Sequence, residues 1–398
     1  MSDQTINILP TAIYVHIPFC VRKCPYCDFT SYSGREHLFS PYAQALGREI
    51  HRTAARFSDA LISTIYFGGG TPNILPYELL RKVLAEIKAC FTVATHAEIT
   101  VEANPGVQPQ EVCPTACCLR ESGFTRLSLG VQSLNNTELK LLGRIHTRED
   151  AVLAFHEARD AGFENINVDL MYGIPGQTLG SWRETLDAVI ALAPEHVSLY
   201  SLSVEEGTPF WDMYQAGNLQ LPNSDAEADM YEMAIEKLGN HGFLHYEISN
   251  FARPGLQCRH NVTYWKNEPY FGFGAGATSC LEGTATRRPE CLYVRATNVR
   301  DVEEYIRRSQ AEEHLTEIDD CADRKTAMGE TMFLGLRMLE GVDTYAFHQR
   351  YGVSIHQVFG AENSELMRRG LLEETDRHIR LTSKGLLLAN EVFMKFVG

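Results

Sequence analysis

The sequence has no long hydrophobic run and fewer basic than acidic residues. No apolar stretch approaches the roughly 18 residues that a membrane-spanning helix needs, and the first ten residues, MSDQTINILP, lack the basic-then-apolar pattern of a secretory leader. Lysine and arginine together number 36 against 51 aspartates and glutamates, so the formal net charge is −15. This composition disfavours nucleic-acid binding, which usually needs a basic surface. We expect a cytoplasmic protein with neither a transmembrane segment nor a nucleic-acid partner, while peripheral contact with a membrane stays open.

A fourth cysteine is missing from the one short stretch that carries three. Residues 19–29 read FCVRKCPYCDF, where Cys20, Cys24 and Cys27 are followed by Phe29. Three thiolates in a loop after a strand can hold three corners of a cubane iron–sulfur cluster and leave one iron without a protein ligand. An open coordination position marks a catalytic rather than a structural metal site. The alternatives are a zinc site with two or three ligands, or thiols without metal.

Disulfides are not expected among the eleven cysteines, because the cytosol keeps thiols reduced. The CPTACC segment at 113–118 predicts buried thiols on a helix, since two thiols without a second pair seldom form a metal site. The isolated cysteines also predict single buried thiols: Cys90, Cys280, Cys291 and Cys321.

Six short β-branched or apolar runs alternate with longer segments of helical periodicity between residue 12 and about residue 205. Strands that alternate with helices pair in parallel through right-handed crossovers. Six such units predict an α/β fold, a partial (β/α)6 barrel, with a doubly wound sheet as the alternative. Unusual residues follow the carboxyl ends of the runs, where barrel enzymes place their chemistry. The runs are 12–18, 63–72, 97–105, 126–133, 165–176 and 196–209.

The chain divides into three predicted regions. Residues 1–205 form the barrel, and residues 206–319, rich in aromatic residues and glycine, complete it. Residues 320–398 predict three helices, two short strands around a polar turn and a last helix, which is typical of a winged-helix-like α+β domain. The segment SIHQVFGAENSELMRRG in this region is not a basic stripe, so we expect a packing or docking module rather than a DNA reader.

A wider pattern accompanies the cysteine triplet. CxxxCxxC after YVHIPF and GGGTP after the second strand resemble the radical S-adenosylmethionine (radical SAM) superfamily, and the resemblance covers nearly the whole chain. It implies that Cys20, Cys24 and Cys27 bind a 4Fe-4S cluster whose fourth iron is chelated by the amine and carboxylate of S-adenosylmethionine. In that superfamily the reduced cluster cleaves the sulfonium bond and releases a 5′-deoxyadenosyl radical, so the cofactor carries the chemistry.

The same resemblance assigns the residues of a cofactor pocket. The triglycine turn lacks Cβ atoms, which lets backbone carbonyls approach the methionyl ammonium. Arg144 offers a planar fork to the methionyl carboxylate, and Asp169 can accept hydrogen bonds from the ribose hydroxyls. Taken singly, such residues are also compatible with an ordinary turn, a core position or a rim salt bridge. The predicted set is Tyr14, Tyr26, Gly68, Gly69, Gly70, Thr71, Glu102, Gln132, Arg144 and Asp169.

Two porphyrin-related branches of the superfamily fit the chain. The oxygen-independent coproporphyrinogen III oxidases read CxxxCxxCxC where this chain has Phe29, and they carry a longer segment before the cluster. HNVTYW at 260–265 matches the HNxxYW motif of the heme chaperones. The resemblance therefore favours a chaperone that binds heme and delivers it to heme-acceptor proteins of the respiratory chain, and it leaves enzymatic turnover open. An oxidase that decarboxylates two propionates of coproporphyrinogen III is the alternative, and the acidic charge disfavours a DNA-binding regulator.

The HNVTYW segment also has a direct chemical interpretation. His260 can offer an imidazole to heme iron, while Tyr264 and Trp265 provide flat aromatic surface for a macrocycle. Cys258, two residues earlier, is an alternative axial ligand. The competing interpretation is a hydrogen-bonded core histidine. The predicted heme-binding residues are His260, Asn261, Tyr264 and Trp265.

Overall fold

The computed structural model describes residues 9–107, 115–286 and 288–397. Six strands form the centre of its main sheet: β1 (Ala12–Ile17), β2 (Leu61–Gly69), β3 (Thr92–Ala103), β4 (Arg126–Gln132), β5 (Ile166–Tyr172) and β6 (His196–Ser201). They pair in parallel and in chain order. Each strand overlaps one of the six predicted runs, so the α/β fold class is confirmed.

Residues 206–319 extend this sheet on both sides. Beyond β6 lie β8 (Asn250–Ala252) and then β7 (Leu244–Glu247), both antiparallel to their neighbours. On the other side, β9 (Tyr270–Phe273) pairs in parallel with β1. It is followed by β10 (Thr278–Glu282), β11 (Tyr293–Asn298) and β12 (Thr316–Ala322). The region thus supplies both flanks of the sheet, although the boundaries at 205 and 319 stay predictions.

Helices connect the strands and begin where the sequence offers caps. Thr147 and Asp150 form a capping box at the start of one helix, and Thr178 and Ser181 form another. Short 3-10 turns occupy Glu36–Leu38, Pro72–Ile74 and Thr284–Thr286. The helices of this part are α1 (Phe39–Ala54), α2 (Tyr77–Cys90), α3 (Thr115–Glu121), α4 (Asn136–Leu141), α5 (Arg148–Asp160), α6 (Leu179–Leu192), α7 (Pro209–Gln215), α8 (Ser224–Asn240), α9 (Arg259–Trp265) and α10 (Val302–Gln310).

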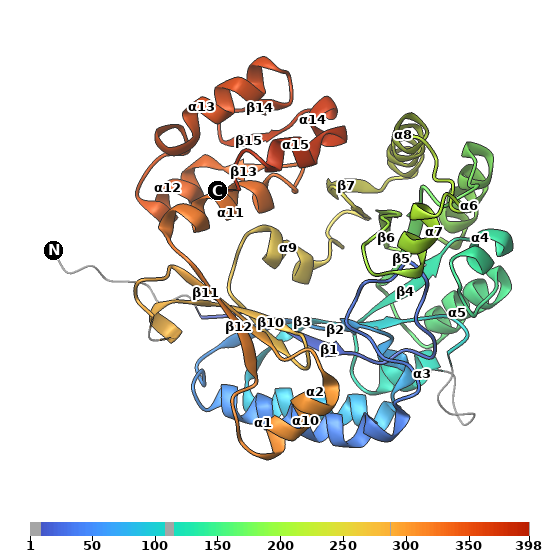
Figure 1. The fold of residues 1–398 in the computed structure, drawn as a ribbon, viewed down its shortest axis with the longest axis vertical. Coiled ribbons are helices and arrows are strands. Elements are labelled where there is room, and N and C mark those ends of the chain that lie inside the picture. Colours follow the sequence, from blue (N-terminus) through green and yellow to red (C-terminus); the bar gives the residue numbers. More distant parts are fainter. Residues whose placement is uncertain (1–8, 108–114, 287, 398) are drawn as a thin grey trace.

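The sheet curves into an open barrel. From β1 to β6 the strand order never reverses, whereas a doubly wound sheet reverses its order to place helices on both faces. Helices such as α1, α2 and α10 cover the outer side of the curve, while α9 lies on the inner side (Figure 1). Within the described residues the sheet order has two ends, β12 and β7, so the prediction of a partial barrel is confirmed.

The central strands are buried from both sides, as is usual for parallel sheets. Every residue of β4 except the last is buried, including Arg126. One apolar cluster joins these strands to the outer helices, with Phe67, Leu129 and Val168 among its members. Packing on the outer face thus leaves the inner face and the carboxyl ends of the strands for polar residues.

The C-terminal region has the predicted three helices followed by a hairpin, but a third short strand joins the sheet and two short helices, rather than one, follow the hairpin. A second apolar cluster holds it together and includes Met332, Phe347 and Leu366. Its three-stranded sheet has the order β13-β15-β14 and consists of β13 (Val342–Asp343), β14 (Leu372–Glu374) and β15 (His378–Leu381). The helices are α11 (Arg324–Gly335), α12 (Thr344–Tyr351), α13 (Ile355–Arg368), α14 (Ser383–Leu387) and α15 (Ala389–Phe393).

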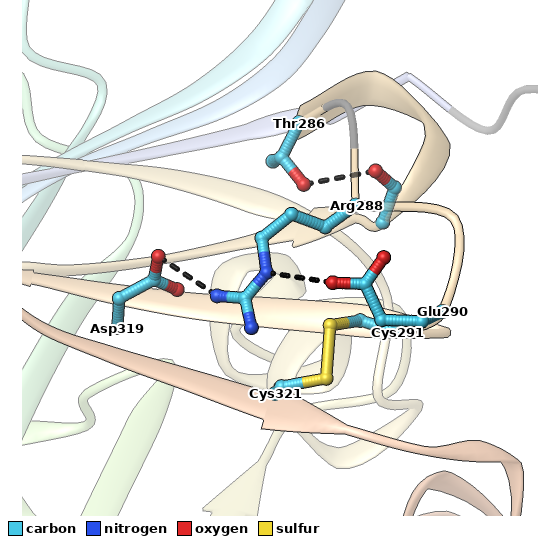
Figure 2. The surroundings of a disulfide bond; sticks show 7 residues. Thr286, Arg288, Glu290, Cys291, Asp319 and Cys321 are labelled. Atoms are coloured by element: carbon cyan, nitrogen blue, oxygen red, sulfur yellow. Dashed lines mark hydrogen bonds and ion pairs between the residues drawn. A yellow bond between two sulfur atoms is a disulfide. The ribbon is translucent and has the colours of Figure 1, made fainter.

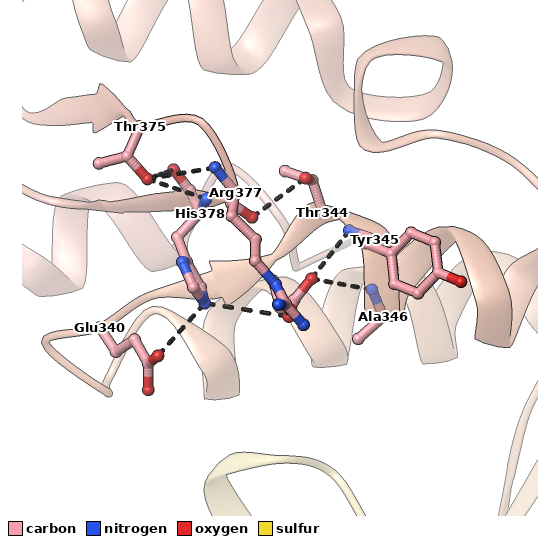
Figure 3. A network of polar contacts seen from close by, with 8 residues as sticks. Glu340, Thr344, Tyr345, Ala346, Thr375, Arg377 and His378 are labelled. Carbon is pink, nitrogen blue, oxygen red and sulfur yellow. Dashed lines mark hydrogen bonds and ion pairs between the residues drawn. The ribbon is translucent and has the colours of Figure 1, made fainter.

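Polar contacts fix the hairpin to the start of α12 (Figure 3). Asp343 caps that helix by accepting hydrogen bonds from the backbone amides of Tyr345 and Ala346. Arg377, in the turn between β14 and β15, donates from Nε to Asp343 Oδ2 at 2.7 Å. The Arg377 carbonyl accepts from the Thr344 amide at 2.9 Å. These bonds set the hairpin against the second helix, the arrangement of a winged helix.

One pair of cysteines contradicts the prediction of isolated thiols. Cys291 and Cys321 form a disulfide with an S–S distance of 2.08 Å (Figure 2). The antiparallel pairing of β11 with β12 brings these two residues, 30 positions apart, to 5.3 Å between their Cα atoms. Arg288 lies beside them and forms ion pairs with Glu290 and Asp319. The interpretation of Cys291 and Cys321 as single thiols is wrong, because their sequence separation carries no trace of this strand pairing.

Removal of the disulfide should lower the stability of the protein. A cross-link that closes a loop of 30 residues removes conformational entropy from the unfolded chain. We expect Cys291→Ser to lower the free energy of unfolding by about 2–4 kcal/mol, measured by urea unfolding under oxidising conditions. Dithiothreitol should destabilise the wild type to the same extent and leave the variant unchanged. If dithiothreitol leaves the urea unfolding curve of the wild type unchanged, the predicted contribution of the disulfide is wrong.

Candidate functional site

The carboxyl ends of the parallel strands surround one cavity of about 400 Å³. Clefts that bind small molecules usually enclose ~300–1,000 Å³. The cavity brings together most of the residues that the sequence predicts for the cluster and the cofactor. Those that line it are Cys20, Cys24, Cys27, Tyr26, Gly69, Gly70, Thr71, Glu102, Gln132, Arg144 and Asp169.

The three predicted cluster ligands lie in the loop after β1. The Cys27 amide donates to the Cys24 carbonyl at 3.1 Å, which turns the loop back on itself. Two side chains donate to sulfur, because Thr71 Oγ1 lies 3.5 Å from Cys20 Sγ and Arg144 Nη1 lies 3.8 Å from Cys24 Sγ. Donors and positive charge favour the thiolate, which is the form of cysteine that binds metal.

The sulfur atoms are not arranged around one point. Among the described residues, no three histidine, cysteine, aspartate or glutamate side chains come together as ligands of a single ion. A cubane cluster binds each thiolate at a different iron, so its ligands need no common point. Burial raises the pKa of the Cys20 and Cys27 thiols.

The triglycine turn joins β2 to the cysteine loop. The Gly70 amide donates to the Ile17 carbonyl at 2.9 Å, and the Thr71 amide donates to the Phe19 carbonyl at 2.7 Å. A Cβ at Gly70 would lie 2.6 Å from the Phe19 carbonyl oxygen, and Gly69 has a φ of +112°. Both positions therefore require glycine, and the turn brings two backbone segments to one wall of the cavity.

Arg144 is held at the cavity by residues of two neighbouring strand ends. Its Nη2 donates to Asn104 Oδ1 at 2.5 Å and to the Gly130 carbonyl at 2.8 Å. Asn104 Nδ2 in turn donates to Thr71 Oγ1 at 2.8 Å, which connects the arginine to the glycine turn. Sequence reasoning missed Asn104. Its signal was its place at the carboxyl end of β3, two residues after Glu102.

Asp169 and Gln132 reach the cavity from β5 and β4. Asp169 accepts hydrogen bonds from Ser128 Oγ at 3.0 Å and from Asn167 Nδ2 at 2.8 Å, and burial raises the pKa of its carboxyl. Gln132 has a φ of +66°, a left-handed conformation that is uncommon for residues other than glycine. Such conformations concentrate at functional sites, and here the strained backbone lies at the predicted position.

Glu102 is paired with a tyrosine that sequence reasoning missed. Tyr66 Oη donates to Glu102 Oε1 at 2.8 Å, and the Gly69 amide lies 3.2 Å from Oε2. Burial, reinforced by the charge of Asp169, raises the pKa of the Glu102 carboxyl to about 7. The hydrogen bonds from Tyr66 and Gly69 oppose this rise, because they favour the ionised form. Tyr66 lies in the strand that ends in the triglycine, and that position was its only signal.

Two predicted pocket residues lie behind the cavity wall. Tyr14 does not line the cavity, and its hydroxyl donates to His16 Nδ1 at 2.9 Å. Gly68 does not line it either, since the Tyr66 ring lies over it. Tyr26 does line the cavity as predicted. Direct cofactor contact by Tyr14 and Gly68 stays a prediction.

The HNVTYW segment does not line the cavity. It forms most of α9, between the sheet and the C-terminal helices (Figure 1). His260 is 1% exposed, with Nδ1 at 2.9 Å from Thr64 Oγ1 and Nε2 at 2.9 Å from Tyr264 Oη. Both ring nitrogens are thus engaged within the protein. The predicted heme contacts stay predictions, and none of the four lines the cavity: His260, Asn261, Tyr264 and Trp265.

The cysteines outside the triplet take other positions. Cys258, the alternative heme ligand, is fully buried with its Sγ at 3.6 Å from Glu98 Oε1, and burial raises its pKa to about 12. Cys113 lies outside the described residues. Cys118 and Cys280 are buried, as predicted. Cys90 and Cys117 are partly exposed, which differs from the prediction.

The donor set of the cavity fits an iron–sulfur cluster together with S-adenosylmethionine. Three thiols stand at one end, and Arg144 beside them presents a fork that matches a carboxylate. Glu102 and Asp169 present anionic oxygens to a ligand that carries an ammonium, a sulfonium and ribose hydroxyls. The bound cluster would supply the redox chemistry, while these side chains bind and orient the nucleotide.

The fold and the site define a radical SAM protein. The family model described as the Radical SAM superfamily matches residues 14–189, and the one described as the HemN C-terminal domain matches residues 322–388. Within that superfamily the chain belongs to the family of the heme chaperone HemW. HemW of Bacillus subtilis (strain 168) is 39% identical over 386 residues, 97% of this chain and 98% of that protein. HemW of Escherichia coli (strain K12) is 32% identical over 394 residues, which cover 99% of this chain and 100% of that protein.

A solved structure shares the whole fold. Coproporphyrinogen III oxidase (HemN) from Escherichia coli, a radical SAM enzyme, matches with a TM-score of 0.81 and covers 98% of this chain and 90% of its own. Its sequence is 24% identical, and at this level the likeness shows the fold alone. Among the described residues, no helix has the length and apolar character that crossing a membrane requires.

The Glu102 carboxyl predicts a pH dependence of cofactor binding. S-adenosylmethionine is cationic, so it binds the ionised carboxylate better than the neutral acid. Because burial raises the pKa of Glu102 to about 7, the carboxylate is lost as the pH falls through neutrality. Affinity, measured by anaerobic calorimetry, should rise up to about tenfold between pH 6 and pH 8. Glu102→Gln should remove this rise. An equally steep rise of affinity with pH in the variant would refute the role of the Glu102 carboxylate.

Proposed function

We propose that this chain is a cytoplasmic heme chaperone. It binds a 4Fe-4S cluster, S-adenosylmethionine and heme, and it transfers heme to heme-requiring proteins of the respiratory chain. The similarity to curated heme chaperones over almost the full length, with 39% identity to HemW of B. subtilis, carries this proposal. The cavity that combines three thiols with Arg144, Glu102 and Asp169 supports the cofactor part of it.

An oxygen-independent coproporphyrinogen III oxidase is the second candidate, favoured by the shared fold with HemN. The residue at position 29 argues against it. Oxidases of this type carry a fourth cysteine there, and this chain has Phe29, a residue that is 62% exposed. The loop therefore presents an aromatic ring to solvent in place of a thiol.

One anaerobic preparation separates the two candidates. We expect the reconstituted protein to bind heme, with a Soret band that saturates on titration. We also expect no protoporphyrinogen IX from coproporphyrinogen III in the presence of S-adenosylmethionine and a reductant. Purified HemN run in parallel serves as the positive control for turnover. Substantial turnover by this chain would overturn the chaperone assignment.

The position of the heme follows from size and charge. A cavity of about 400 Å³ that holds a cluster and a nucleotide has no room for a macrocycle, so we place the heme at its rim. Phe29, Arg22 and Lys23 are exposed there. Lys23 Nζ donates to the Phe29 carbonyl at 3.1 Å, and among the described residues neither cation forms an ion pair with a carboxylate, although Asp28 lines the same rim. A flat ring beside two cations without carboxylate partners complements an apolar macrocycle with two propionates.

Heme titration of three variants tests this placement against His260. Arg22→Glu with Lys23→Glu should weaken heme binding by about tenfold or more, because two attractive charges become repulsive. Arg81→Glu with Lys82→Glu changes the same dipeptide on the exposed face of α2 and should leave the affinity unchanged. Iron and sulfide contents, measured in every variant, show that the cluster persists. If only His260→Ala loses heme, the iron ligand lies on α9 and the rim placement is wrong.

A further inference from the structure

Side-chain contacts that the sequence does not reveal connect the HNVTYW helix to the cofactor pocket. On one side, the α9 residue His260 stacks on Tyr66, with ring centroids 5.1 Å apart and planes at 26°. On the other side, Tyr66 lines the cavity and donates to Glu102. Three side chains thus connect the interior helix to the carboxylate that faces the cofactor.

His260 is held rigidly in this chain. Thr64 and Tyr264 bond its two ring nitrogens, each at 2.9 Å, and Tyr264 also packs edge-on against the imidazole at 4.9 Å. The amide of His260 donates to Glu98 Oε1 at 3.1 Å, which ties the start of α9 to β3. Burial lowers the pKa of His260 to about 3, so the ring stays neutral and acts as a fixed flat surface.

Tyr66 has little freedom on the opposite side. A Cβ at position 68 would lie 2.9 Å from Tyr66 Cε1 and 2.9 Å from Glu102 Oε1. Gly68, which does not line the cavity, therefore leaves the space in which the tyrosine ring and the carboxylate meet. The ring of Tyr66 lies between this glycine and His260, and Tyr14 also stacks on it with ring centroids 6.2 Å apart.

We propose that His260 is a positioning residue of the cofactor pocket, which fixes the ring of Tyr66 so that Tyr66 holds Glu102 toward the cofactor. The inference rests on the proposed binding of S-adenosylmethionine, and it assigns α9 a role separate from heme ligation. Removal of the imidazole leaves space into which Tyr66 can rotate, and Glu102 then loses its tyrosine donor. The affected quantity is the ionisation of Glu102, which a general loss of stability does not change.

Other ionisable groups also face Glu102, and the test must leave them unchanged. Asp169 raises the pKa of Glu102 and Arg126 lowers it. Apart from Tyr66 itself, Tyr14 of β1, Tyr200 of β6 and Tyr264 of α9 also interact with it electrostatically. No substitution below removes any of them.

The first experiment follows the Glu102 carboxyl in the cofactor-free protein by NMR of 13C-labelled glutamate, assigned with Glu102→Gln. The wild-type midpoint should lie at about 7. His260→Ala should raise it by roughly one unit, the lower end of the one to two units that a lost hydrogen bond to an ionised group is worth. His260→Phe keeps a flat ring against Tyr66 and should restore most of the wild-type midpoint.

Two further variants separate positioning from a structural role. Tyr66→Phe should shift the midpoint as His260→Ala does, and the double variant should add nothing, since both act through one hydroxyl. His245→Ala is the matched control. It removes a ring that stacks on Phe251 at 4.2 Å in β8, and it should leave the Glu102 midpoint unchanged. An unshifted midpoint in His260→Ala, or additive shifts in the double variant, overturns the inference.

The second experiment measures S-adenosylmethionine affinity in the reconstituted protein. At pH 7, His260→Ala should bind about fivefold more weakly than the wild type, as a midpoint shift of one unit requires, with the difference vanishing at pH 9. If the wild type binds no S-adenosylmethionine, the proposed function is wrong. The shift of the NMR midpoint is measured without the cofactor, so it tests the positioning role separately. An affinity loss that persists unchanged at pH 9 overturns the positioning role, because it is independent of Glu102 ionisation.

Discussion

The convergence of six parallel strands at one edge of a curved sheet is the constraint on which the site depends. Each strand ends within the same cavity, so residues from positions 20 to 205 line it together. The cysteine loop follows β1, the glycine turn ends β2, and Asn104 lies at the end of β3. A change in the register of any one strand would move its polar residues away from the others.

The interior of this barrel is polar, and hydrogen bonds make that burial tolerable. Buried carboxyls and imidazoles cost free energy unless they have partners. Asp169 accepts from Asn167, whose Oδ1 lies 2.6 Å from His196 Nδ1, and His196 Nε2 lies 2.8 Å from Tyr246 Oη. The orientation of one pocket carboxylate therefore depends on residues of β5, β6 and β7, so the pocket is a property of the whole sheet rather than of its rim.

Much of the fold was predictable because its signals are local. Strand runs, glycine turns and helix caps are written in windows of a few residues, and all six central strands lie where those windows predict them. Most of the pocket residues were predictable for a related reason. Parallel strands bring their carboxyl ends to one edge, so the residues that follow each strand could be assigned to one cavity without coordinates.

The failures have a common cause. The Cys291–Cys321 disulfide joins residues 30 positions apart through the pairing of β11 with β12, and no local pattern encodes that pairing. Tyr66 and Asn104 were missed because their importance comes from the side chains they bond across strands. The surroundings of His260 were equally hidden. Its motif suggests metal ligands, but it lies in a helix on the inner side of the curved sheet, and both ring nitrogens of His260 are hydrogen-bonded within the protein.

By itself the sequence determined the β/α alternation, the cysteine triplet and the glycine turn, because each is specified by residue types at short spacing. Only the tertiary structure decided which buried groups meet: Cys291 with Cys321, Tyr66 with Glu102, and His260 with Thr64 and Tyr264. The physical reason is that contacts between distant segments depend on strand register and sheet curvature, and these emerge from the packing of the whole chain.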